Sequence, residues 1–219
     1  MRLYLCRLTF HENLFFATRE VGRLYETGRF LHNYALTYAL GLAQSTYFHA
    51  QQIPTYQEEL EPLNERSIYV TPARGVKISY DLVTFKYADN AYRVKMAPGS
   101  RNTPSFGRAK EIAVGSVFEF GVLSQSPLVL PTWIRMGLWQ SKARLNIFAE
   151  VDLAPKPLGE QQASFPLNPL DTPGEFRLFD LISMPPSSLL EHPVLESEWL
   201  HGNVDNQEWW LPAGMKYTF

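Results

Sequence analysis

The spacing of hydrophobic residues predicts a β-rich chain with one helix that is buried on most of its circumference. Residues 3–10 are rich in aromatic and branched side chains, which favours a first strand. In residues 30–42 the apolar side chains recur at helical spacing beside one narrow polar row. A helix of this kind needs an apolar cover, and we expect a sheet to supply it.

Later segments alternate apolar and polar residues as strands do. The predicted strands are residues 67–71, 76–87, 112–123 and 145–151, with a turn at 72–75. Residues 51–66 are polar and contain Pro54 and Pro62, so we expect a connector with at most one short helix. Gly137 predicts a tight turn ahead of the last strand.

Residues 13–29 combine arginines, glutamates and glycines in an unusual way. If the segment is helical, Arg19 and Arg23 lie on one face, and Gly22 and Gly28 interrupt an otherwise amphipathic pattern. Two interpretations stay open. The segment is either a connector held by arginine–glutamate ion pairs, or it presents two arginines to phosphate groups.

The C-terminal part is rich in proline. Eight prolines fall within residues 154–193, which favours extended, wandering chain over a new compact layer, and only residues 174–182 have a strand pattern. Beyond them, Trp199, Trp209 and Trp210 stand among acidic residues. Such tryptophans are usually packing anchors, although an acidic rim also suits a protein interface.

Composition places the chain among globular proteins. It has 219 residues, 45% of them hydrophobic, which is enough for an ordinary core. The single cysteine, Cys6, permits no internal disulfide and fits a reducing compartment. We find no secretory signal pattern and no apolar run approaching the roughly 20 residues that a membrane span needs, so we expect a soluble cytoplasmic protein with no membrane partner.

The net charge of -2 hides a strong segregation of charge along the chain. Residues 1–65 carry 5 basic and 7 acidic side chains, residues 66–144 carry 12 and 4, and residues 145–219 carry 3 and 11. This division indicates an anionic partner at the basic centre and a basic protein at the acidic third. Alternatively, the acidic part neutralises the basic part within the fold.

Two basic clusters are candidates for binding nucleic acid. Residues 90–115 interleave basic and aromatic side chains with proline and glycine, which predicts an extended basic loop or hairpin suited to a single strand. A basic loop that binds no ligand is the alternative. The second cluster adjoins Gly137 and is a plausible phosphate nest. The basic residues of the two clusters are Arg93, Lys95, Arg101, Arg108, Lys110, Arg135, Lys142 and Arg144.

Motifs for common enzyme chemistries are absent from the sequence. It contains no phosphate-binding Walker loop, dinucleotide fingerprint, HExxH or nucleophile elbow, and its five histidines lack the spacing of metal ligands. We therefore expect no metal and no cofactor. His32, helped by Tyr34 or Lys142, could serve as acid or base in RNA cleavage, but a structural histidine is the favoured interpretation.

A likeness to a known family is strongest in Asn13, Leu14, Phe15, Phe16, Ala17, Thr18, Arg19, Glu20, Gly22, Arg23, Leu24 and Tyr25, followed by Leu31, His32, Asn33, Tyr34, Ala35 and Leu36. A looser likeness involves Pro131 and the residues around Gly137. Taken together, these residues resemble the Cas5-type RAMP subunit of type I-D CRISPR Cascade complexes, and the resemblance fades beyond Pro155.

The resemblance implies an α+β fold. Residues 1–153 would form a ferredoxin-like, RRM-related RAMP core with an antiparallel sheet, the helix 30–42 and an inserted β-hairpin thumb at about residues 90–110. Residues 154–219 would form a proline-rich, irregular, acidic extension packed on the core. The sequence lacks the RNP motif of an ordinary RRM, so we expect loops and arginines to hold RNA.

The resemblance also implies a function. Subunits of this kind hold the 5′ handle of the CRISPR RNA (crRNA), cap the backbone subunits, contact the large subunit and lie near the place where target double-stranded DNA enters. We expect a subunit without catalytic activity; the alternative is a metal-independent RAMP endoribonuclease centred on His32. The expected RNA-binding residues are Arg19, Arg23, Arg93, Lys95, Arg101, Arg108, Lys110, Arg135, Lys142 and Arg144.

Overall fold

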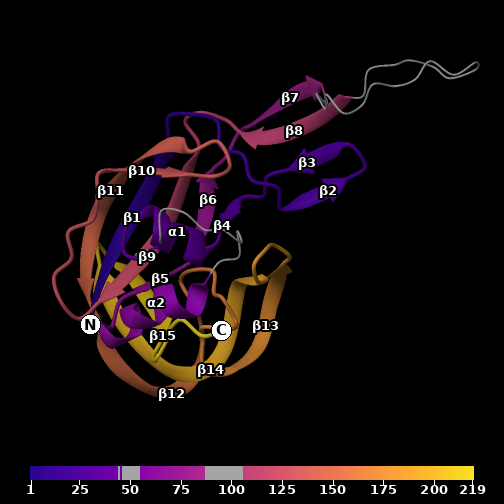
Figure 1. Ribbon diagram of the computed structural model, residues 1–219. Helices are drawn as coiled ribbons and strands as arrows, with labels where there is room; N and C mark the ends of the chain where they lie inside the picture. Colours follow the sequence, from indigo (N-terminus) through magenta and orange to yellow (C-terminus); the bar gives the residue numbers. More distant parts are fainter. Residues whose placement is uncertain (44, 46–54, 87–105) are drawn as a thin grey trace, which may run out of the picture.

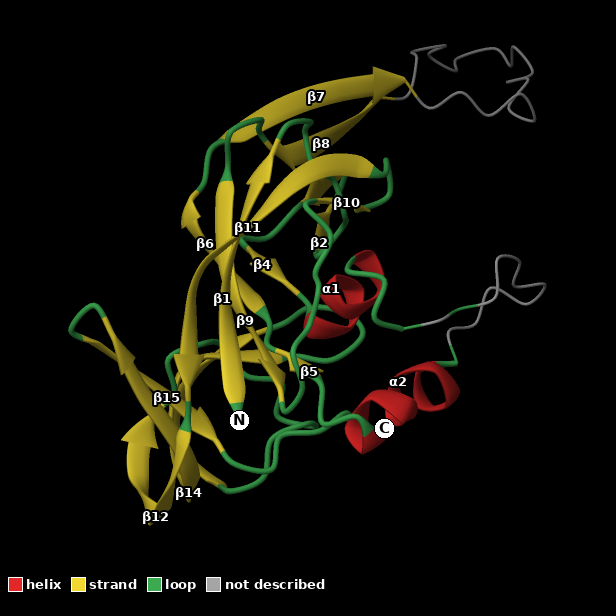
Figure 2. Ribbon diagram, turned by 90° about the vertical axis from the view of Figure 1, so that its left-hand side faces the viewer, coloured by secondary structure: helices red, strands yellow, loops and turns green. Residues whose placement is uncertain are grey.

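The computed structural model describes residues 1–43, 45, 55–86 and 106–219, and in these residues the chain is mostly antiparallel β structure with two helices (Figure 1). The largest sheet is strongly curled (Figure 2). Its strands are β1 (Arg2–Phe10), β4 (Phe30–Leu31), β5 (Tyr69–Val70), β6 (Ala73–Lys77), β9 (Val117–Ser124), β10 (Trp133–Met136) and β11 (Ser141–Asp152).

This sheet is built around β1, the predicted first strand. β1 pairs antiparallel with β11 on one side and with β9 on the other. The full order is β10-β11-β1-β9-β6-β4, and β5 also pairs with β9. Leu3, Leu5 and Leu8 of β1 are fully buried, as expected for a central strand. The predicted turn at residues 72–75 is wrong, because β6 begins at Ala73 and pairs with β9.

The strand order bears on the expected ferredoxin-like core. The order β11-β1-β9-β6 would fit a βαββαβ unit, in which the last and first strands are neighbours. Such a unit also needs a helix between its third and fourth strands, whereas residues 125–140 contain turns and β10. The antiparallel sheet is confirmed, and the ferredoxin-like classification stays a prediction.

The first helix is shorter than predicted. α1 (Asn33–Ala39) begins after the N-cap His32, because residues 30 and 31 belong to β4 and pair with Arg74 and Ala73 of β6. Leu36 of α1 packs into the main core together with Phe118 and Phe120 of β9. Each large apolar side chain buried in this way contributes about 1.5–3 kcal/mol. The second helix, α2 (Tyr56–Glu65), buries Leu60 and Leu63 in a neighbouring part of the core.

The proline-rich C-terminal part forms a second sheet, so the prediction of extended, wandering chain is wrong. The predicted strand at 174–182 is confirmed. The sheet has the order β12-β14-β13, and β15 also pairs with β14. Pro155 lies in an edge strand, where a missing N–H is tolerated. The strands are β12 (Ala154–Gln162), β13 (Glu175–Ile182), β14 (Leu189–Val204) and β15 (Gln207–Pro212).

A buried carboxylate links this second sheet region to α1. Asp171 is 2% exposed and accepts hydrogen bonds from Asn33 Nδ2 at 2.7 Å and from the hydroxyls of Tyr34 and Tyr69 at 3.0 and 3.2 Å. Burial raises the pKa of the Asp171 carboxyl, and these hydrogen bonds oppose the shift. Because the Asp171 carboxylate would be buried without donors if it left this position, the network fixes residues 163–173 against the helix.

A third, smaller sheet projects from one end of the curled sheet (Figure 1). It has the order β2-β3-β8-β7, and β7 pairs with β8 along its whole length. The predicted thumb at residues 90–110 lies largely outside the described residues. The strands of this sheet are β2 (Arg19–Val21), β3 (Leu24–Glu26), β7 (Tyr80–Lys86) and β8 (Phe106–Ile112). Neither α1 nor α2, the helices of the described chain, is long and apolar enough to cross a membrane.

Candidate nucleic-acid interface

Arg19 and Arg23 lie on a β-hairpin, so the helix considered for residues 13–29 is wrong. β2 and β3 pair antiparallel, with Val21 opposite Leu24. Gly22 and Arg23 form the two-residue loop, and Gly22 has a φ of +62°. A glycine at the first central position matches the tight hairpin turn that follows the twist of the strands. The loop therefore presents the Arg23 side chain at the tip of the hairpin.

The charge of Arg19 is largely compensated within its own hairpin. Its guanidinium donates to Glu26 Oε2 from Nε at 3.0 Å and from Nη2 at 2.6 Å. Lys110 Nζ lies 3.6 Å from the other oxygen of Glu26 and 4.3 Å from the ring centroid of Tyr80. The hydrogen bond from Arg19, helped by Lys110, lowers the pKa of the Glu26 carboxyl. The geometry around Arg19 therefore agrees with both interpretations of residues 13–29, the connector held by ion pairs and the phosphate site.

Arg23 and Arg108 are the more available pair of cations. β3 and β8 run parallel, and the Arg108 amide donates to the Arg23 carbonyl oxygen at 2.8 Å. Among the described residues, neither guanidinium has a carboxylate within ion-pair distance. Both line an open groove of about 350 Å³ together with Phe106, which is 47% exposed. Two cations beside an exposed ring can contact a phosphate and a base of one strand.

The second basic cluster is assembled by the predicted glycine turn, which is confirmed. Gly137 has a φ of +79°, and a Cβ atom there would lie 2.5 Å from Leu14 Cδ1 and 2.9 Å from the Phe15 carbonyl oxygen. The turn is held by a hydrogen bond from the Leu138 amide to that same carbonyl, at 2.9 Å. Only glycine fits this close approach, which sets the register of β10 against β11.

Because of this register, Arg135, Lys142 and Arg144 come together on the outer face of the sheet. Arg135 lies opposite Lys142, and Arg144 lies opposite Trp133. Residues directly opposite in a pair of strands project on the same face. Lys142 Nζ lies 4.3 Å from the ring centroid of Trp133, and Arg135 Nη1 donates to the Gln140 carbonyl oxygen at 2.8 Å. The predicted cluster is thus a single surface.

Several residues of this surface were not identified from the sequence. Trp133 is 42% exposed, and the His11 ring lies 5.0 Å from it, centroid to centroid. On the same face of β1, Arg7 stacks over Phe148 and pairs with Glu119 at 2.6 Å. The alternation in β10, where Ile134 and Met136 are buried while Trp133 and Arg135 are exposed, is the signal that could have identified Trp133.

Three predicted residues lie outside the described part of the chain. These are Arg93, Lys95 and Arg101, which belong to the unassigned residues 87–105. The described flanks of that segment, β7 and β8, form the antiparallel pair on which Arg108 and Lys110 lie. The described structure thus places seven of the ten predicted residues, four on the small sheet and three on the curled sheet.

His32 has a structural role at the start of α1. Its Nδ1 accepts a hydrogen bond from the Tyr34 amide at 3.2 Å, so Nε2 carries the hydrogen and contacts Ser187 Oγ at 2.9 Å. The residue is 3% exposed, and burial lowers the pKa of its imidazole to about 4. The neighbouring apolar pocket, of about 230 Å³, is lined by residues such as Tyr38 and Met184. Both ring nitrogens are thus engaged in the helix cap and its support.

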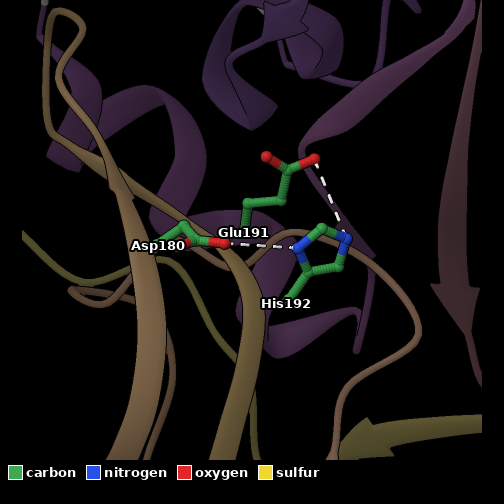
Figure 3. A group of neighbouring side chains, drawn as sticks. All are labelled: Asp180, Glu191 and His192. Carbon is green, nitrogen blue, oxygen red and sulfur yellow. Dashed lines mark hydrogen bonds and ion pairs between the residues drawn. The ribbon is translucent and has the colours of Figure 1, made fainter.

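A group of potential metal ligands lies on the second sheet (Figure 3). Asp180, Glu191 and His192 have donor atoms within 4.8 Å of one another in the described chain. Arg29 already pairs with Glu191 at 3.0 Å, and His192 Nδ1 lies 3.4 Å from Asp180 Oδ2. The arrangement is a charge cluster in which His192 lies between two carboxylates, one of which, Glu191, is neutralised by an arginine.

Comparison with known proteins agrees with the resemblance found in the sequence. No curated protein matches the chain. The family model described as type I-D CRISPR-associated protein Cas5/Csc1 matches residues 1–219. Since this match spans the whole sequence, the chain belongs to the Cas5/Csc1 family of type I-D CRISPR-associated proteins.

Proposed function

We propose that this chain is an RNA-binding subunit of a type I-D CRISPR interference complex and that it holds the 5′ handle of the crRNA. The observation that carries the proposal is the pairing of cations with exposed rings on two surfaces. One surface has Arg23 and Arg108 beside Phe106, and the other has Lys142 and Arg144 beside Trp133. Cations that follow phosphates and rings that stack bases are typical of single-strand binding.

The two surfaces are joined by one stretch of chain, which supports a continuous path for RNA. Leu14 bridges to Ile112 at the end of β8, and the Phe15 carbonyl accepts from the glycine turn between β10 and β11. The segment then continues into β2, which carries Arg19. A strand of RNA that crosses residues 13–18 would contact both sets of cations.

For the fold, we propose a ferredoxin-like core in which the second crossover helix is replaced by β10. The strand order supports this description. The pair β7–β8 would be the base of the predicted thumb, whose other basic residues, Arg93, Lys95 and Arg101, lie outside the described residues. In the assembled cytoplasmic complex, the subunit would cap the backbone subunits, contact the large subunit and lie near the place where target DNA enters.

We also propose that the subunit is not a nuclease. A general acid or base must reach the atom whose proton it transfers, and its pKa works best near the operating pH. His32 is buried, its two nitrogens are hydrogen-bonded, and its pKa is about 4. Tyr34, one of the two candidate helpers, donates a hydrogen bond from its hydroxyl to Asp171. These observations favour the structural role over the endoribonuclease alternative.

The test uses the purified chain with fluorescent RNA. Anisotropy titrations compare a repeat-derived 5′ handle with a scrambled RNA of equal length and composition, at two salt concentrations. We expect tighter binding of the handle and weaker binding at high salt. Equal affinity for both RNAs would contradict handle recognition. Incubating labelled repeat RNA without metal tests the nuclease alternative, and site-specific cutting that is lost in His32→Ala would establish it.

A further inference from the structure

The edge strand β13 exposes a row of large apolar side chains. Leu178, Phe179 and Leu181 are 68%, 43% and 63% exposed. Their neighbours Phe176 and Ile182 pack into the two apolar clusters at the ends of the strand, so the exposed middle is held in place by buried ends. Exposed apolar side chains that follow one another along a strand mark a surface that normally has a cover.

The same strand also offers unpaired backbone groups. Within the described chain β13 pairs with β14 alone, and it lies at the outer edge of its sheet (Figure 1). A free edge with apolar side chains invites another strand unless prolines or charged side chains oppose the addition. Residues 175–182 contain no proline and three charged residues, Glu175, Arg177 and Asp180. Arg177 is already held by Glu175 and Glu196, and Asp180 contacts His192.

The surroundings of β13 are acidic. Residues 154–212 carry 9 acidic and 2 basic side chains. Asp180 of β13 has a side chain that is 73% exposed and contacts His192 at 3.4 Å (Figure 3). Glu160 of the same sheet also acts electrostatically on Arg177. A partner strand placed on this edge would therefore meet apolar side chains together with an excess of negative charge.

We propose that β13 docks a basic, extended segment of another protein, which adds to the free edge of the sheet. Backbone hydrogen bonds would supply affinity, the exposed leucines would fill apolar positions of the partner, and Asp180 would meet its lysines or arginines. A second copy of this chain is disfavoured, because two acidic sheets would face each other. The partner is a protein of the same complex, so the inference rests on the proposed function.

Hydrogen exchange tests this inference on the full chain. Amide exchange of β13 is measured for the free protein and for the purified assembled complex. We expect exchange of the β13 amides to slow in the complex. Zero-length carbodiimide coupling of the complex should also join Asp180 to a lysine of another subunit.

Substitution supplies the matched test. The double variant Leu178→Lys/Leu181→Lys should incorporate into the complex roughly tenfold less well. The control Leu158→Lys, on the opposite edge of the same sheet with 64% exposure, should incorporate normally. Handle-RNA affinity of each purified variant should equal that of the unsubstituted chain, because the change lies away from both basic clusters.

The outcomes separate this inference from the proposed function. If the chain is incorporated but β13 exchange is unchanged and the double variant is incorporated normally, the docking proposal is wrong and the RNA-binding proposal stands. Dimerisation of the free chain that Leu181→Lys abolishes would assign the edge to a second copy, and would also overturn the basic partner. A chain that never enters the complex would overturn both proposals.

Discussion

The ammonium nitrogen of Lys142 lies 4.3 Å from the ring centroid of Trp133, on the outer face of the curled sheet. Arg144 lies opposite Trp133 in the register of β10 and β11. Lys142 and Trp133 therefore form one unit, in which a cation is held at the face of an exposed ring. Such a unit can place a phosphate and a base of the same nucleotide, and this property can be tested by substitution.

Neutralising Lys142 and Arg144 should weaken RNA binding, and it should also make the binding less dependent on salt concentration. In Lys142→Gln/Arg144→Gln, each lost phosphate contact should lower the slope of log K against log salt by about 0.7. Anisotropy titrations of the handle RNA at several salt concentrations measure this slope. The control is Arg2→Gln, at the other end of β1, where Arg2 pairs with Glu150 and Asp152. An unchanged slope in the double variant would show that the cluster is an ordinary solvated surface.

Removing the ring of Trp133 should have an effect that salt does not abolish. Stacking of a base on an aromatic side chain contributes about 1–3 kcal/mol, so Trp133→Ala should lose binding free energy of this order, whereas Trp133→Phe should retain part of it. Phe179→Ala is the matched control, since Phe179 is 43% exposed and Trp133 is 42% exposed. Equal affinities of Trp133→Ala and the unsubstituted chain would argue against stacking at this position.

Arg108 and Arg19 of the small sheet should differ in their effects on affinity. Arg108→Gln removes a cation that has no carboxylate within ion-pair distance in the described chain, whereas Arg19→Gln removes one that Glu26 already neutralises. We therefore expect Arg108→Gln to weaken handle binding more than Arg19→Gln does. Parallel titrations of the two variants measure the difference. The reverse order would mean that Glu26 releases Arg19 when RNA binds.

The central strands could be predicted because their sequences alternate strongly and are buried. Residues 3–10 and 145–151 lie in β1 and β11 as expected. Local patterns were misleading where pairing over long distances decides the structure. Residues 30 and 31 continue the helical spacing of α1, but they pair with β6 and form a strand. Such a pairing depends on residues more than forty positions away, which a local pattern does not contain.

The second sheet could not be predicted for a related reason. Pro193 lies within the 16-residue strand β14, and Pro155 lies within β12. Proline argues against a central strand, except at a bulge or on an edge strand. The sequence alone does not reveal which residues lie at a bulge or on an edge. For the site, the basic clusters were visible from residue type, and so was the aromatic Phe106 among the basic residues of 90–115. Trp133 and His11 became candidates only when the pairing of β10 with β11 placed them beside cations.

His32 should make the stability of the protein depend on pH. Its pKa is about 4 in the folded protein, against an ordinary value of 6.5, so between these values the unfolded chain binds more protons. Stability is therefore lost as the pH falls from about 6.5 to about 4, by about 3 kcal/mol. Urea unfolding of the unsubstituted chain and of His32→Asn, which can still cap the helix, measures the difference. Parallel pH profiles of the two proteins would contradict a buried neutral His32.

Crosslinking of the crRNA in the purified complex tests the central claim most directly. Ultraviolet irradiation, digestion and mass spectrometry identify which peptides of this chain carry nucleotides of the 5′ handle. We predict adducts on the peptides that contain Trp133 and Phe106, and on the hairpin of residues 19–26. Handle adducts confined to other subunits, with none on this chain, would contradict the proposal that it holds the handle.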